Sequence, residues 1–136
     1  MVQSVDPKTP VSKKLIWTGR TLSALAILFL LSDSIIKVMQ AAPAVEGTKA
    51  LGYEKRAVFG IGIVELACVL LYAIPQTSLL GAIFLTGYLG GAIASHARID
   101  SPLFTHTLFP IYVALLIWGG LLLREERLRK LVPLRR

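Results

Sequence analysis

Long apolar tracts separated by short polar or proline-containing segments dominate the hydropathy pattern of this chain. A helix that crosses the bilayer needs about 20 mostly apolar residues. Tracts of this kind run from about residue 15 to 38, 57 to 74, 79 to 95 and 104 to 123. The pattern therefore predicts an all-α membrane protein, a four-helix transmembrane bundle that forms one membrane domain over residues 1–136.

The breaks between these tracts contain residues that end helices. Uncharged sequence from Leu66 to Ala97 is too long for one crossing, and Pro75 divides it into the second and third spans. Pro110 is expected to bend the fourth helix near its outer end. The longest connection, residues 39–56, is predicted to form a loop or a short interfacial helix.

The composition agrees with lipid as the main solvent. The 136 residues are 54% hydrophobic and only 17% charged, and a water-soluble domain of this size could not bury so much apolar surface. The formal charge is +7, and the Lys and Arg residues that produce it lie beside the apolar spans. This position favours anionic lipid over nucleic acid as their partner. A single cysteine, Cys68, excludes an intramolecular disulfide framework, and no metal site is expected.

The distribution of basic residues predicts the orientation of the bundle. Of the 15 Lys and Arg residues, ten lie near the two ends of the chain and five near the opposite ends of the spans. Because cytoplasmic segments carry the excess of Lys and Arg, both termini are predicted to be cytoplasmic in this multi-pass protein. Residues 124–136 form a basic cytoplasmic tail with some acidic residues, so we expect an amphipathic helix there.

Four ionisable side chains in or at the end of the predicted spans stand out, Asp33, Lys37, Glu65 and His96, because a charge there is costly unless it faces protein, water or a partner. Asp33 and Lys37 lie four residues apart on one helix face, so they form either a structural ion pair or part of a site. Glu65 lies near the middle of the second span, and no residue one turn away can satisfy a carboxylate. Its partner is therefore a proton or another helix, which makes it either a bundle-stabilising group or a ligand or proton site.

The polar end of the third span is expected at the same depth as the polar end of the first, because both helices run outward. These groups, with a deeper carboxylate, are predicted to line an outward-facing pocket with a polar mouth and an apolar floor. The predicted ligand-binding residues are Glu65, His96, Asp33, Lys37, Ser95 and Arg98. For His96 the alternative is a satisfied interfacial histidine. His106 begins the fourth span, but haem is not favoured, since paired axial ligands normally face each other across a bundle interior.

Small residues recur every four positions on the third span, at Gly87, Gly91 and Ser95. Such a strip lets membrane helices approach closely. We expect it to pack against another helix of the same chain. Packing against a second copy, which would make a homo-oligomer, is the alternative.

The order of several short segments resembles the DoxX-like family. These are residues 62–67 (GIVELA) with the mid-span Glu65, the stop at Pro75, and residues 87–96 (GYLGGAIASH). The resemblance covers the chain from the first span to the apolar end of the fourth. It implies a small four-helix protein of the bacterial inner membrane, and the family takes its name from a subunit of a thiosulfate–quinone oxidoreductase. It therefore suggests a membrane subunit that handles a quinone or positions a redox partner protein.

Three functions stay open at this point. The first is an accessory or ligand-binding subunit, not an enzyme on its own and without a covalent cofactor, in which His96 donates to a quinone carbonyl and Glu65 accepts a proton. Tyr72, Tyr88 or Trp118 would supply aromatic walls. The second is a small transporter or proton pathway, because intramembrane carboxylates and histidines are what proton relays require. The third is a structural partner protein whose buried polar groups only hold the bundle together.

Overall fold

The computed structural model describes residues 13–131. Within this part of the chain, four helical stretches are long and apolar enough to cross a membrane: Lys13–Val38, Lys55–Ala73, Pro75–Arg98 and Leu103–Arg124. The helices are α1 (Lys13–Val38), α2 (Ala42–Ala50), α3 (Lys55–Ala73), α4 (Ser78–Arg98), α5 (Phe109–Arg124) and α6 (Glu126–Leu131), with a 3₁₀ turn at Pro75–Thr77 and a π-helical turn at Leu103–Thr107. The predicted all-α, four-helix membrane fold is confirmed.

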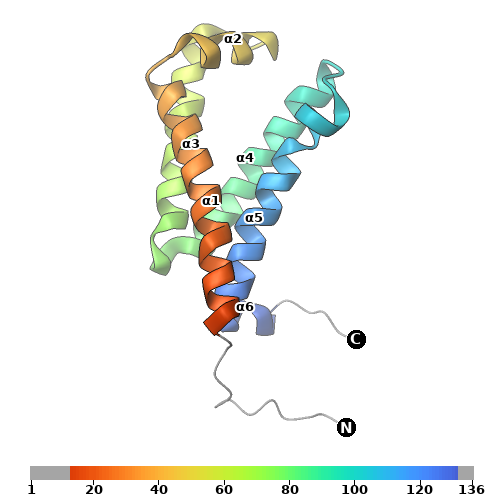
Figure 1. Ribbon diagram of the computed structural model, residues 1–136. Coiled ribbons are helices and arrows are strands. Elements are labelled where there is room, and N and C mark those ends of the chain that lie inside the picture. The colour runs from red at the N-terminus through yellow and green to blue at the C-terminus, as the bar shows by residue number, and fades with distance from the viewer. Residues whose placement is uncertain (1–12, 132–136) are drawn as a thin grey trace.

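The four long helices run lengthwise through the molecule, and α2 lies across one end (Figure 1). Both α1 and α4 pack against α3 and α5. Figure 1 also shows that α1 and α5 lie close together where α1 begins and diverge toward the α2 end. Because α6 ends where α1 begins, the described chain starts and finishes at the same end of the bundle.

The connection between α3 and α4 forms at the predicted proline. Pro75 restricts the residue before it to extended backbone, and Ile74 has φ −82° and ψ 120°. Two hydroxyl groups then satisfy carbonyls at the end of α3: Thr77 Oγ1 donates to Leu71 O at 2.7 Å, and Ser78 Oγ donates to Tyr72 O at 2.7 Å. The chain therefore reverses direction within a few residues and α4 packs against α3.

Residues between the first two spans form a short helix, α2, so the expectation of a helix there is confirmed, and its position at the membrane interface stays a prediction. The backbone leaves α1 through Gln40, which has a left-handed φ of 53°, and α2 follows with Pro43 in its first turn. Ala44 and Val45 of α2 are buried against Val58 of α3. This contact fixes α2 over the end of the α1–α3 pair.

A continuous apolar core extends through all four long helices. Its buried side chains include Leu30 of α1, Val69 of α3, Leu85 of α4 and Ile117 of α5. Many other large apolar side chains are exposed, including Leu28 and Leu115 at 62% and 66%. In a membrane these outward side chains contact lipid, so they add no aggregation hazard.

Tyr72 stabilises the end of the bundle where α1 begins. Its hydroxyl donates to Ile117 O at 2.8 Å and lies 2.8 Å from Ser23 Oγ, which joins α3 to α5 and α1. The side chain is completely buried, and the Arg124 guanidinium lies 5.6 Å from its ring centre. Tyr72 is therefore part of the core and not an aromatic wall of a ligand site.

Close helix contacts occur at glycines other than the predicted strip. Gly19 of α1 and Gly120 of α5 face each other, and a Cβ at Gly19 would lie 2.7 Å from Gly120 O. The expected packing of Gly87 and Gly91 against another helix of the chain is wrong, because a Cβ at either position meets open space to 4 Å. Ser95 likewise bonds to the Tyr53 hydroxyl and not to a packed helix face. Packing against a second copy stays a prediction.

The fourth span has the predicted extent, because the helical stretch Leu103–Arg124 matches the predicted residues 104–123, but the bend expected at Pro110 is wrong. Pro110 lies in the first turn of α5 and does not bend a helix. The N–H groups of a first turn have no acceptor within the helix, so a proline there breaks no hydrogen bond. The π-helical turn precedes it, held by Leu108 N donating to Leu103 O at 2.8 Å. At the other end, α5 stops at Arg124 and α6 follows after extended Glu125. Residues 132–136 of the predicted tail lie outside the described part of the chain.

Candidate functional site

A partly buried hydrogen-bonded cluster joins three spanning helices around the ammonium group of Lys37. Lys37 Nζ donates to a carboxylate oxygen of Asp33, to Glu65 Oε2 at 2.9 Å and to the Tyr88 hydroxyl at 2.8 Å. The Tyr88 hydroxyl donates in turn to Glu65 Oε2 at 2.9 Å. We call these four residues the Lys37 cluster. It links α1, α3 and α4.

Local sequence explains how the ammonium reaches its partners. Asp33 and Lys37 are one helical turn apart, so their pairing is a property of α1 alone. Glu65 is on α3, and α1 approaches it closely because Gly62 has no side chain: a Cβ there would lie 2.8 Å from Lys37 Cβ. The expected need of Glu65 for a partner on another helix is met by Lys37 and Tyr88.

Burial within the Lys37 cluster is uneven. Glu65 is 0% exposed, the Lys37 side chain is 15% exposed and that of Asp33 is 32% exposed. Glu65 Oε2 accepts two hydrogen bonds, whereas its Oε1 is buried and has no hydrogen-bond partner among the described residues. A buried carboxylate oxygen without a hydrogen-bond donor is costly. Glu65 Oε1 can therefore still accept a hydrogen bond, whereas Oε2 is already paired.

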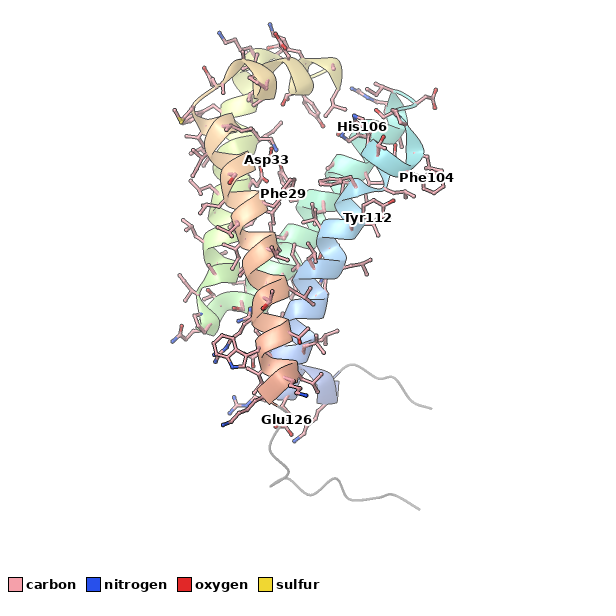
Figure 2. All side chains as sticks on the ribbon, in the orientation of Figure 1. Phe29, Asp33, Phe104, His106, Tyr112 and Glu126 are labelled. Carbon is pink, nitrogen blue, oxygen red and sulfur yellow. The ribbon has the colours of Figure 1, made fainter. Side chains whose placement is uncertain are left out.

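A cavity of about 590 Å³ adjoins the Lys37 cluster, all four of whose residues line it. Most of the remaining lining is apolar or glycine, such as Phe29, Gly91 and Val113. Residues of α2, among them Thr48, line its outer part. Phe29 and Asp33 lie on α1, and His106 lies at the turn before α5 near the α2 end (Figure 2). The cavity therefore lies between the helices toward the α2 end.

The polar end of α4 forms the outer part of the cavity. Ser95 and His96 both line it, with Ser95 Oγ 2.8 Å from the Tyr53 hydroxyl and His96 Nδ1 3.1 Å from Ser101 Oγ. The His96 and His106 rings meet edge to face with centres 5.7 Å apart. The hydrogen bond at Nδ1 leaves Nε2 of His96 for another partner.

Five of the six predicted ligand-binding residues line this one cavity, and Arg98 does not. Arg98 instead donates through its guanidinium to Leu51 O, and it lies against Gly52, whose φ of 93° requires glycine or strain. It connects the end of α4 to the segment between α2 and α3. Arg98 is therefore placed to hold the outer wall and not to touch a ligand inside.

The sequence pattern did not predict the hydrogen bonds that two tyrosines make at this site. Tyr88 was expected only as an aromatic wall, but its hydroxyl belongs to the Lys37 cluster. Tyr53 was not singled out, although it lines the cavity and bonds to Ser95. Trp118, the third suggested wall, donates to Thr86 Oγ1 at 2.8 Å and is absent from the cavity lining. The position of Tyr88 in the middle of a predicted span was the signal that its hydroxyl needs a hydrogen-bond partner inside the bundle.

Comparison with known proteins gives one match. The model of the DoxX-like family matches residues 21–120, which include the whole Lys37 cluster and the entire lining of the cavity. No curated protein and no solved structure matches the chain. Because the family model covers most of the chain, this multi-pass membrane protein belongs to the DoxX-like family.

Proposed function

We propose that this protein is a ligand-binding subunit of a redox-related membrane complex and that its cavity holds a lipophilic molecule of the quinone class. The observation that carries the proposal is the position of the Lys37 cluster on the wall of a mostly apolar cavity. A few convergent polar groups in an apolar pocket are the usual composition of a small-molecule site.

The size of the cavity supports this ligand class. Pockets for drug-sized ligands have volumes of about 300–1,000 Å³, and the cavity measures about 590 Å³. Phe29 and Phe109 offer aromatic surface to a ring, while Glu65 and His96 offer polar contacts to its oxygen atoms. In this proposal the chain binds and orients the molecule. A redox partner protein of the same complex carries out electron transfer, as the family resemblance implies.

We further propose that the protein lies in the bacterial inner membrane with both ends of the chain in the cytoplasm. The excess of Lys and Arg near the two ends supports this orientation. The common location of the start of α1 and the end of α6 also supports it (Figure 1). The cavity would then open in the outer half of the membrane, beneath α2.

Neighbouring glycines on α4 allow a direct test. Gly91 lines the cavity and Gly90 does not, and a Cβ at either position meets open space to 4 Å. Gly91→Phe should therefore occupy the cavity without disrupting the bundle, whereas Gly90→Phe should leave the cavity free. Binding of decylubiquinone, in its oxidised and reduced forms, is measured by calorimetry on the purified full-length protein in lipid nanodiscs.

We expect the wild-type protein and Gly90→Phe to bind at least one form, and Gly91→Phe to bind on the order of tenfold more weakly or not at all. If the wild-type protein binds neither form, or if Gly91→Phe binds as well as Gly90→Phe, the proposed site is wrong.

A proton pathway is the second candidate, favoured by three ionisable side chains within spanning helices: Asp33, Lys37 and Glu65. Proteoliposomes with an internal pH-sensitive dye distinguish the two functions. Proton flux that the wild-type protein supports and Glu65→Gln abolishes would favour the pathway. Ligand binding without such flux favours the subunit.

A further inference from the structure

The hydrogen-bond donors of the Lys37 cluster are already used within the protein. An ammonium group has three N–H donors, and Lys37 Nζ has three acceptors: Asp33, Glu65 and Tyr88. The single O–H of Tyr88 is donated to Glu65 Oε2. A ligand that reaches this part of the cavity therefore finds no donor that is free without breaking an existing bond.

An acceptor, in contrast, is free. Glu65 Oε1 has no hydrogen-bond partner among the described residues, although the side chain is completely buried and lines the cavity. Glu65 pairs with the Lys37 ammonium through Oε2, which is the arrangement of an ionised carboxylate, and such a group accepts hydrogen bonds only. Oε1 itself is covered in the structure, so contact with a ligand requires the side chains over it to move.

We propose that the cavity selects a ligand that donates a hydrogen bond from a hydroxyl group to Glu65 Oε1. The inference rests on the proposed function and refines it: within the quinone class, the form that carries such a hydroxyl is the hydroquinone. A quinone carbonyl has only lone pairs, which would face the lone pairs of Oε1. The hydroquinone replaces the missing donor and gains a charge-assisted hydrogen bond.

The expected preference is measurable. A hydrogen bond to a charged group changes affinity by roughly 10-fold or more when the partner is lost. Calorimetry on the full-length protein in nanodiscs compares decylubiquinol kept reduced under anaerobic conditions, decylubiquinone, and the dimethyl ether of decylubiquinol. The ether keeps the shape of the hydroquinone but has no O–H. We expect the hydroquinone to bind on the order of 10-fold more tightly than either of the other two.

Glu65→Gln provides a test that a merely structural role would not satisfy. Lys37 and Tyr88 both donate to Oε2, so the amide oxygen of glutamine should take that position and its NH₂ group should take the position of Oε1. The acceptor becomes a donor. We expect the preference to invert, with decylubiquinone binding more tightly than decylubiquinol. Circular dichroism and gel filtration verify that the variant folds, and the three-ligand comparison on the wild-type protein decides the question without it.

The outcomes separate the inference from the proposed function. If none of the three compounds binds, the proposed function fails. If decylubiquinone binds the wild-type protein as tightly as decylubiquinol, or if the ether does, the cavity is a quinone-class site but the hydroxyl selectivity is wrong. Decylammonium is a further probe: binding tighter than that of the hydroquinone would show that Glu65 recognises a cation, and it would overturn the inference.

Discussion

Lys37 lies directly against Gly62 where α1 meets α3. A Cβ placed on Gly62 would come within 2.8 Å of Lys37 Cβ and 2.9 Å of Val38 N, closer than real Cβ atoms approach other atoms. The absence of a side chain at one position of α3 therefore sets the spacing of two spanning helices. That spacing in turn lets the Lys37 ammonium reach Glu65.

Gly62→Ala should separate α1 from α3 at this contact and weaken the ion pair. Overpacking of this kind costs about 1–3 kcal/mol. Gly60→Ala is the matched control, because a Cβ at Gly60 meets nothing within 4 Å. Thermal unfolding in detergent, followed by circular dichroism, should show a lower midpoint for Gly62→Ala alone. Equal midpoints for the two variants would contradict the close contact.

Lys37→Met should be strongly destabilising. It leaves the carboxylate of Glu65 buried without its cationic partner, and removal of one member of a buried ion pair costs roughly 3–5 kcal/mol. The double variant Lys37→Met/Glu65→Gln no longer contains that buried charge and should recover much of the loss. Reversible unfolding in mixed micelles of the wild-type protein, the two single variants Lys37→Met and Glu65→Gln, and the double variant gives the coupling energy. A double variant no more stable than Lys37→Met would contradict the interpretation that the loss comes from the unpaired Glu65 carboxylate.

Arg98→Gln should loosen the segment between α2 and α3. The Arg98 guanidinium donates to Leu51 O, and because this contact is exposed its loss should cost about 1 kcal/mol. Amide hydrogen exchange should become faster at Gly52 and Tyr53, whose N–H groups bond to Lys49 O and Thr48 O. Arg56→Gln is the control, since its partner Glu54 is a surface residue. Similar exchange in both variants would mean that Arg98 does not hold this segment.

Cysteine labelling should show opposite sides for α2 and the start of α1. In a Cys68→Ala background, Glu46→Cys on α2 should react with a membrane-impermeant maleimide in spheroplasts whose inner membrane is intact. Lys14→Cys at the start of α1 should react only after the membrane is permeabilised. Both positions are exposed in the structure. The reverse pattern would place the cavity on the cytoplasmic side.

The spans could be predicted from the sequence because their determinants are local. The length of the apolar tracts and the position of Pro75 located all four spans to within a few residues. Asp33 and Lys37 were also paired correctly, since residues four apart on a helix are neighbours whatever surrounds them. The bend expected at Pro110 was wrong, because the sequence alone does not show whether a proline lies in the first turn of a helix or within it.

The contacts between helices could not be predicted in the same way. A small-residue strip suits close packing and a cavity wall equally, and only the arrangement of α4 shows that Gly87 and Gly91 line the cavity. The Tyr88 hydroxyl reaches Lys37 and Glu65 for a similar reason, since helical phase and crossing angle decide which side chains meet. Whether the six predicted ligand-binding residues bind a ligand stays a prediction.

The composition of the Lys37 cluster has an electrical consequence. It holds two carboxyl groups and one ammonium group within spanning helices, so uptake or release of one proton there moves charge through part of the transmembrane field. A full crossing is worth about 2.3 kcal/mol per 100 mV, and a cluster partway across experiences a fraction of it. The membrane potential would therefore assist or oppose any proton movement at this cluster, whereas the same cluster in de-energised vesicles experiences no such bias.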